Sequence, residues 1–295
     1  MSLYQNWFLA SRPWSFSMTA ISVSVGAALG AMAGDFSWPF YLVTLAGMIF
    51  MHAATNLMND YYDVLSGVDY QETSTAQYRP HPLLEGKLKP AQVRIGAFIL
   101  YALSATAGMY LAAFRGWALL WIGLIGIFAS ISYTAPPFKY KYKALGELSV
   151  FLMWGPLMVE GAYFVQRQTF SMEAFWVSLP FGVLVALVLL INNTRDIGHD
   201  KQKGIITIPI LIGQRNGFRL YLTLVIVAYM GILWMSVFGP LDLWSLIVFV
   251  SMPLAIRLLK QMRYEIPLDA DARTAQLDTA FGVLLVISMI PGGLL

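Results

Sequence analysis

Long apolar stretches alternate with shorter polar ones along the whole chain. A transmembrane helix needs about 20 predominantly apolar residues, because it must cross about 30 Å of hydrocarbon. The pattern predicts nine such helices, at 14–33, 39–57, 93–113, 117–133, 148–165, 174–191, 218–238, 241–258 and 277–293. We therefore expect an all-α, polytopic membrane bundle of nine transmembrane helices. No segment between them resembles a soluble domain, so 1–295 is expected to form a single integral-membrane domain.

Composition excludes the main classes of soluble protein. Of 295 residues, 58% are hydrophobic and only 12% are charged, whereas a soluble domain has about 25% charged residues. This excludes a soluble enzyme, a disordered protein and a nucleic-acid-binding protein. The chain has no cysteine, which excludes disulfides, thiolate metal sites and a Cys nucleophile. Residues 1–11 lack the features of a cleaved signal peptide.

Positive charge is concentrated on one side of the predicted bundle. Of the 19 Lys and Arg residues, only Arg115 and Arg167 lie outside the N-terminal segment, the four long connections (58–92, 134–147, 192–217 and 259–276) and the helix ends next to these connections. The positive-inside rule then places the N-terminus and these four loops in the cytoplasm. We expect a multi-pass protein of the cell's inner or plasma membrane, with its C-terminus outside and its active site on the cytoplasmic side.

Two polar segments with matching spacing occur where predicted helices reach the cytoplasm. The first contains Asn59 and Asp63, and the second, four helices later, contains Asn192, Asp196 and Asp200. Residues four apart share one face of a helix, so each segment presents a row of oxygen atoms. The repeated Asn-x-x-x-Asp spacing suggests an internal duplication, in which helices one to four recur as five to eight.

Facing rows of carboxylates repel one another unless a cation lies between them. Hard oxygen ligands suit Mg²⁺, which keeps several waters and completes its coordination with substrate phosphates. The alternative is that these residues are helix caps or solvated loop residues. Two clusters on the same side of the membrane, with the same spacing, favour the functional interpretation, since ionisable groups at such positions usually face the bundle interior.

Basic residues lie between the two acidic segments. Arg79 follows the first, and Lys139, Lys141 and Lys143 alternate with tyrosines in the second long loop. Cations that contact a metal-bridged diphosphate stabilise it as a leaving group. Alternatively, a basic residue on this side can simply follow the positive-inside rule and contact no substrate. We adopt this interpretation for Lys87, Lys89 and the basic residues of the last loop. For Arg79 and at least one of the three lysines we favour the functional role, although the alternation does not show which lysine faces inward.

Two ionisable residues fall within predicted helices. His52 lies one turn from Asn56, so it either lines the same cavity or is a hydrogen-bonded structural residue. Glu160 lies toward the outer side and receives no role.

These segments closely resemble the UbiA-type intramembrane prenyltransferases. The family's first motif matches Asn59, Asp63 and Asp69, and its second matches Asp196 and Asp200. The family also has a Tyr followed by a Lys in its fourth cytoplasmic-side segment. The Tyr matches Tyr133, and alignment on the sequence Lys-Tyr-x-Ala-Leu-Gly matches the Lys to Lys141. Three stretches, 59–69, 145–157 and 192–207, are similar to the branch that prenylates 1,4-dihydroxy-2-naphthoate. The spacing from Asp63 to Asp69 differs from that of the hydroxybenzoate branch.

The resemblance implies a central cavity open to the cytoplasmic leaflet, Mg²⁺, and transfer of a prenyl group from polyprenyl diphosphate to an aromatic acceptor, 1,4-dihydroxy-2-naphthoate, in menaquinone biosynthesis. It implies Mg²⁺ ligands among Asp60, Asp63, Asp69, Asp196 and Asp200. The implied substrate-binding residues are Asn59, Asn192, Asn193, Arg79, Tyr133, Lys139 and Lys141. Asp63, Asp196, Lys141 and Arg79 are the implied catalytic residues, since they hold the metal or neutralise the diphosphate.

Two alternatives to this function stay open. The acceptor is 4-hydroxybenzoate, a glycerol-phosphate lipid or haem in other members of the family. A transporter with acidic ion-coupling sites also has internal repeats, but its sites typically lie near the bilayer midplane. The carboxylates here lie at the cytoplasmic helix ends, which favours the enzyme.

The predicted orientation is tested by single cysteines in this cysteine-free chain. Glu72→Cys and Gln202→Cys should react with a membrane-impermeant thiol reagent only from the cytoplasmic side. Asp35→Cys and Asp242→Cys should react only from outside, because they fall in the short uncharged connections. Labelling of intact cells and of inverted vesicles measures this, and the reverse pattern contradicts the orientation.

Overall fold

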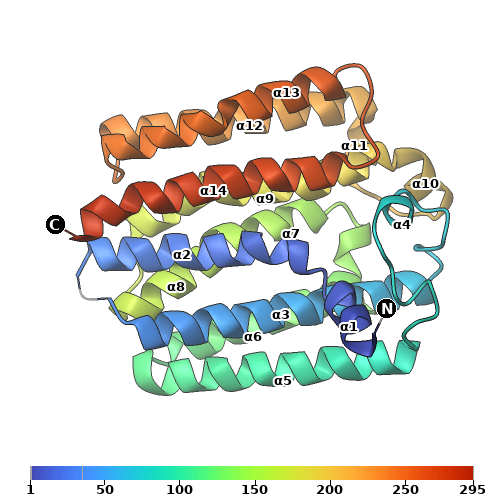
Figure 1. The fold of residues 1–295 in the computed structure, drawn as a ribbon, viewed down its shortest axis with the longest axis horizontal. Helices are drawn as coiled ribbons and strands as arrows, with labels where there is room; N and C mark the ends of the chain where they lie inside the picture. Colours follow the sequence, from blue (N-terminus) through green and yellow to red (C-terminus); the bar gives the residue numbers. More distant parts are fainter. Residues whose placement is uncertain (1, 35, 295) are drawn as a thin grey trace.

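The computed structural model describes residues 2–34 and 36–294, and this part of the chain is almost entirely helical. Long helices run side by side in one bundle (Figure 1). They are α2 (Phe16–Met32), α3 (Trp38–Leu65), α5 (Pro90–Arg115), α6 (Ala118–Thr134), α9 (Met172–Arg195), α12 (Gln214–Phe238), α13 (Met252–Met262) and α14 (Ala270–Leu294). The expectation of an all-α membrane bundle is confirmed. Asp35, which belongs to a predicted outer connection, lies outside the described residues.

Eight helical segments of the described chain are long and apolar enough to cross a membrane. One of them joins α7 (Gly146–Leu152), a π-helical turn (Met153–Leu157) and α8 (Met158–Arg167), and another joins a 3₁₀ segment (Leu243–Ser251) to α13. The remaining expected span, 117–133, forms α6, whose 17 residues extend about 25 Å at 1.5 Å per residue. The total of nine transmembrane helices therefore stays a prediction.

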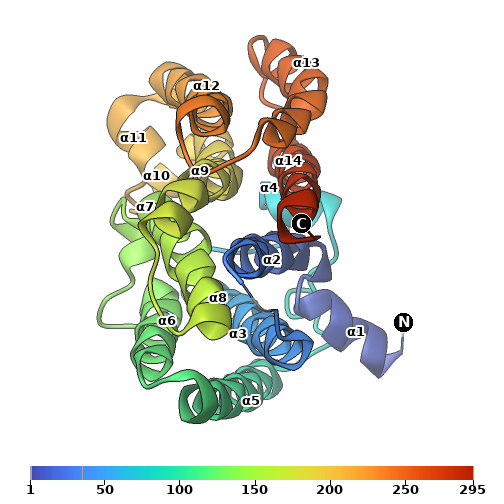
Figure 2. The same ribbon diagram turned by 90° about the vertical axis from the view of Figure 1, so that its left-hand side faces the viewer.

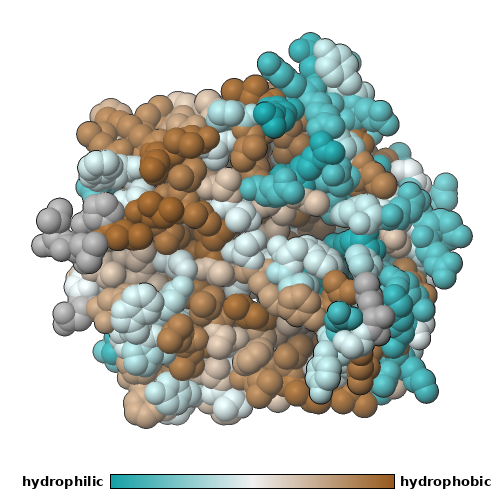
Figure 3. All heavy atoms as spheres, viewed as in Figure 1, coloured by the Kyte–Doolittle hydropathy of each residue, from teal (hydrophilic) through white to brown (hydrophobic). Residues whose placement is uncertain are grey.

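The motif helices extend well past their apolar stretches. The sequence predicts that the second span ends at residue 57, but α3 continues to Leu65, and α9 continues to Arg195 rather than 191. The short helices α1 (Leu3–Ala10), α4 (Ser74–Tyr78), α10 (Ile197–Gln202) and α11 (Ile208–Ile212) gather at this end of the bundle (Figure 1). On the face shown in Figure 3, hydrophilic residues concentrate at the same end, whereas the rest of that face is largely apolar. Asn59 and Asp63 thus lie on α3 and Asn192 lies on α9, beneath a polar cap, whereas Asp196 lies at the bend between α9 and α10.

The order of elements supports the predicted duplication. In each half, a motif helix (α3 or α9) is followed by short helices and then by a long helix (α5 or α12) that packs against the motif helix. The kinked span of α7 and α8 precedes α9 as α2 precedes α3. Helix α14 stands outside this repeat and packs against α2 and α9.

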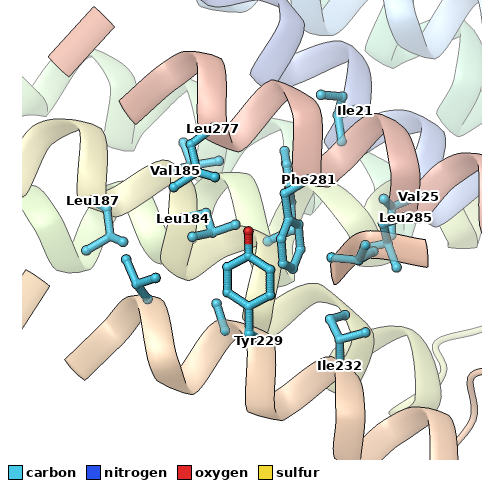
Figure 4. Close-up of a cluster of buried hydrophobic side chains, with 14 of the residues drawn as sticks. Ile21, Val25, Leu184, Val185, Leu187, Tyr229, Ile232, Leu277, Phe281 and Leu285 are labelled. Carbon is cyan, nitrogen blue, oxygen red and sulfur yellow. The ribbon is translucent and has the colours of Figure 1, made fainter. Parts of the chain in front are cut away.

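The largest hydrophobic core fixes the position of α9. Leu184 of α9 packs with Tyr229 and Phe281, from α12 and α14 (Figure 4). Phe181 of α9 belongs to the same cluster. On another side of α9, a Cβ on Gly182 would lie 2.8 Å from the Cα of Gly155. The kinked span therefore packs backbone against backbone on α9, which a larger side chain would prevent. This packing holds the helix that carries the second acidic segment.

Candidate active site

A cavity of about 1190 Å³ lies inside the bundle, lined by residues of α2, α3, α5, α6, α8, α9 and α14, which surround the interior when viewed along the helices (Figure 2). On α3, the lining residues recur every three or four positions from Thr44 to Asp63, about 28 Å at 1.5 Å per residue. Charged groups line only one end of the cavity, and the rest is mostly apolar. A cavity with a charged end and a long apolar body suits an amphipathic ligand.

The first acidic cluster is built on the last turns of α3. Asn59 Nδ2 donates to Asp63 Oδ2 (2.8 Å), as their shared helix face predicts. Lys141 Nζ donates to the same oxygen (2.7 Å) and to Asn59 Oδ1 (2.9 Å). The Tyr142 hydroxyl donates to the other Asp63 oxygen. Asp63 is only 2% exposed, so these contacts compensate a carboxylate that has lost its water.

Lys141 stays charged in this environment. Burial alone lowers the pKa of a lysine, but the charges of Asp63 and Asp69 and the hydrogen bond to Asp63 outweigh burial and raise the pKa of Lys141 above its usual value. The ammonium group is therefore a permanent positive charge at the cavity's charged end.

A short turn selects Lys141 from the three alternating lysines. In the 3₁₀ turn Tyr140–Tyr142, the Tyr140 hydroxyl reaches back to the Ala129 carbonyl (2.7 Å). The following backbone is tied to the loop after α10, because Ile206 N donates to the Tyr142 carbonyl (3.1 Å) and Ala144 N donates to the Ile206 carbonyl (2.8 Å). Lys141 lines the cavity, whereas Lys139 and Lys143 do not.

The second acidic cluster lies at the end of α9. Arg195 donates to Asp196 from Nε (2.9 Å) and Nη2 (2.7 Å), and Nη2 also donates to Asn192 Oδ1 (2.7 Å). The Ser74 hydroxyl of α4 donates to Asp196 Oδ1 (2.8 Å). Asp200 is buried one turn further on, and burial together with the charge of Asp196 raises the pKa of Asp200 to about 6.

Asp69 of the first motif and the second acidic cluster line a second, smaller pocket of about 70 Å³. Residues of both motifs line it together with Lys141: Asp69, Asn192, Asn193, Asp196 and Asp200. Lys141 also lines the large cavity and is thus shared by both. Asn193 Nδ2 donates to Glu147 Oε1 (2.9 Å), which fixes the Asn193 side chain. Carboxylate and amide oxygens predominate in this pocket, and this donor set fits a hard cation such as Mg²⁺.

Asp60 and Asp69 have different surroundings. Asp60 forms an ion pair with Arg12 and lines neither pocket, whereas Asp69 lines both. His81 Nε2 lies 3.8 Å from Asp60 and 3.6 Å from Asp69, and one ligand atom from each of the three lies within 4.8 Å of the others. Burial disfavours the charged form of Asp69, but His81, Lys141 and Arg12 together lower its pKa to about 2.

Arg79 and Tyr133, both named above as candidate substrate-binding residues, line the large cavity. The Arg79 guanidinium lies 5.8 Å from the centre of the Trp14 ring, and burial and the charge of Arg12 lower the pKa of Arg79 to about 10. Lys141 Nζ lies 5.8 Å from the centre of the Tyr133 ring. Both basic groups are therefore positioned beside aromatic faces at the charged end.

Comparison with known proteins identifies the fold and the class. The UbiA prenyltransferase family matches residues 19–281. The chain belongs to the UbiA prenyltransferase family. It is therefore a membrane enzyme that transfers a prenyl group, and the resemblance noted in its motifs is confirmed.

Relatives of this prenyltransferase cover nearly its whole length. It is 29% identical to a 1,4-dihydroxy-2-naphthoate octaprenyltransferase of Bacillus subtilis, over 95% of this chain and 90% of the relative. It is 32% identical to UbiA prenyltransferase domain-containing protein 1 of Mus musculus, over 97% of this chain and 84% of the relative.

Solved structures share its fold. A UbiA homolog from Aeropyrum pernix K1 superposes with a TM-score of 0.65 at 16% identity, covering 93% of this chain and 97% of that one. A UbiA homolog from Archaeoglobus fulgidus, bound to GPP and Mg²⁺, superposes with a TM-score of 0.62 at 15% identity, covering 96% and 99%.

Several residues of the site are not among those predicted. Arg12 lines the cavity and pairs with Asp60, Tyr142 contacts Asp63, and Asp271 of α14 accepts from Arg195 (3.0 Å) and from the Tyr78 hydroxyl (2.5 Å). Arg12 carries a sequence signal, since it is the one basic residue before the first span, next to a proline and a tryptophan. No sequence signal points to Asp271, because α14 comes next to α9 only in the folded bundle.

The two ionisable residues inside the predicted helices are hydrogen-bonded. His52 is hydrogen-bonded at Nδ1 to Thr19 Oγ1 (2.8 Å) and at Nε2 to Ser15 Oγ (3.2 Å). It also lines the cavity, so the two interpretations given for His52 hold together. Glu160 accepts from the Ser171 backbone (3.2 Å), which is a structural contact.

Proposed function

We propose that this prenyltransferase catalyses the Mg²⁺-dependent transfer of a polyprenyl group from polyprenyl diphosphate to 1,4-dihydroxy-2-naphthoate, a step of menaquinone biosynthesis, at the cytoplasmic face of the cell's inner or plasma membrane. The observation that carries the proposal is Lys141, which lies between two acidic clusters at the charged end of a long apolar cavity. The Bacillus subtilis relative supports the choice of acceptor.

The diphosphate belongs at the charged end, where both clusters meet. Asn59, Asp63, Asp69, Asp196 and Asp200 would hold Mg²⁺, which neutralises the diphosphate and assists its departure when bound. Lys141 and Arg79, which line the large cavity, would supply positive charge for the remaining phosphate oxygens. Asn192 and Asn193, which line the smaller pocket, would bind the diphosphate through their amide groups. Asp60 and Lys139 line neither pocket. Because Asp60 forms an ion pair with Arg12, we propose that Asp60 holds the Arg12 side chain in place.

The reaction begins when the allylic C–O bond breaks and its electron pair leaves with the diphosphate. Lys141 then exchanges its contact with Asp63 for the developing charge on the leaving group, which preorganised cations stabilise strongly. The apolar cavity excludes water from the allylic cation, and the Tyr133 ring offers it a cation–π contact. The ring carbon that bears the acceptor's carboxylate attacks the cation, and loss of CO₂ returns the electron pair to the aromatic ring.

The acceptor is tested with purified protein, Mg²⁺ and labelled farnesyl or geranylgeranyl diphosphate. We expect 1,4-dihydroxy-2-naphthoate to be prenylated with release of CO₂. Chelation of the metal should stop the reaction and added Mg²⁺ should restore it. The same assay includes 4-hydroxybenzoate, a glycerol-phosphate lipid and haem. Prenylation of one of these, and not of the naphthoate, contradicts the proposed acceptor.

The acidic clusters are tested by Asp63→Ala and Asp196→Ala. Each should abolish turnover, because each removes a carboxylate that would hold the cation against the diphosphate. Asp269→Ala is a matched control, since Asp269 lies in an exposed ion pair with Arg273 and lines neither pocket. Product formation is measured beside size-exclusion profiles and melting curves. Near-normal turnover in either cluster variant contradicts a two-cluster site.

Lys141 is tested against Lys143, the lysine that lines no pocket. Lys141→Ala should lower kcat by about 10²–10³, with a smaller change in the acceptor's KM, because the lost charge acts mainly in the transition state. Lys143→Ala should change kcat little. Steady-state kinetics with varied donor and acceptor measure both. If Lys143→Ala or Lys139→Ala is the damaging change, the assignment of Lys141 is wrong.

A further inference from the structure

Three glycines of α5 and α6 lack the usual reasons for glycine in a helix. Gly108 on α5, and Gly123 and Gly126 on α6, line the large cavity. A Cβ atom on any of them meets no other group within 4 Å, and none has a positive φ. Glycine is less favourable in a helix than alanine, because it leaves the unfolded backbone more freedom. Neither packing nor backbone conformation therefore accounts for these residues.

Elsewhere in this bundle, glycines serve close helix packing. A Cβ on Gly47 of α3 would lie 2.9 Å from the Cβ of Ala107 on α5, which is the usual role of small residues in membrane helices. Gly108, one residue further along α5, has only open space in front of it. The three cavity glycines thus leave space empty instead of allowing contact, and the space they leave is part of the cavity.

The space beside these glycines is apolar. Met48 and Met51 of α3 and Leu119 and Ile127 of α6 line the same cavity. Gly126 lies about 10 Å along α6 from Tyr133, which marks the charged end, and Gly123 lies about 4.5 Å further, at 1.5 Å per residue. The added distance is close to the length of one five-carbon prenyl unit.

We propose that the compartment beside Gly108, Gly123 and Gly126 holds the prenyl chain of the donor, and that these glycines set the longest chain the enzyme uses. The inference rests on the proposed function, which places the diphosphate between the acidic clusters. A chain that starts there reaches Gly126 before Gly123. A larger side chain at Gly126 therefore limits chain length more severely than the same side chain at Gly123.

The experiment compares Gly126→Leu and Gly123→Leu with three donors, geranyl, farnesyl and geranylgeranyl diphosphate, and the acceptor used by the unmodified enzyme. For Gly126→Leu, kcat/KM with geranylgeranyl diphosphate should fall by about tenfold or more, because the chain no longer fits beside the leucine. Geranyl transfer should be retained. Gly123→Leu should retain farnesyl transfer as well and lose only the longest donor. The acceptor's KM should not change.

Ile125→Phe is the matched control. Ile125 lies on α6 between the two glycines, is exposed, and does not line the cavity, so added bulk there should leave the donor preference unchanged. Retained geranyl transfer shows that each variant is folded. If Gly126→Leu is inactive with every donor, Gly126→Ala should show a weaker form of the same preference.

Three results overturn the inference. The first is an equal loss with all donors in both Gly123→Leu and Gly126→Ala. The second is an unchanged donor preference. The third is a raised KM for the acceptor with donor kinetics unchanged, which assigns the compartment to the acceptor. Failure of the proposed function looks different, because the unmodified enzyme would then transfer no prenyl group from any donor to an aromatic acceptor.

Discussion

The ion pair between Lys141 and Asp63 is the contact on which the site depends. Lys141 Nζ lies 2.7 Å from Asp63 Oδ2, and the Asp63 side chain is only 2% exposed. Removing one partner of a buried pair leaves the other charge uncompensated, which is strongly unfavourable. The pair therefore holds the turn after α6 against the end of α3. The same turn is tied through the Ile206 backbone to the loop after α10, so it links the end of α3 to the segment that follows the second acidic cluster.

The same pair is also suited to be exchanged. Both carboxylate clusters are balanced by cationic side chains, Asp63 by Lys141 and Asp196 by Arg195. A metal-bound diphosphate would give the carboxylates a cation and Lys141 phosphate oxygens, so each charge would keep a partner. The long apolar cavity explains why such chemistry belongs to a membrane bundle, since a prenyl chain is poorly soluble in water and the helices provide an apolar channel.

The sequence was sufficient for the parts of the structure that depend on local pattern. The apolar stretches predicted the helices, and the four-residue spacing placed Asn59 beside Asp63 on one face of α3, where they are hydrogen-bonded. It was insufficient wherever distant segments meet. Asp60 neighbours Asn59 but turns toward Arg12 of the N-terminal segment, and Asp271 reaches Arg195 only because α14 packs on α9. The inward position of Lys141, implied only by family resemblance, depends on a turn fixed by contacts with Ala129 and Ile206.

The central claim is that Lys141 contacts the diphosphate between the two acidic clusters. The most direct test is an experimental structure of the enzyme with Mg²⁺ and a non-reactive prenyl thiolodiphosphate. Our account predicts metal density bridging the diphosphate to Asp63 and to Asp196 or Asp200, with Lys141 Nζ moved from Asp63 onto a phosphate oxygen. A diphosphate bound elsewhere, with the contact between Lys141 and Asp63 intact, would contradict it.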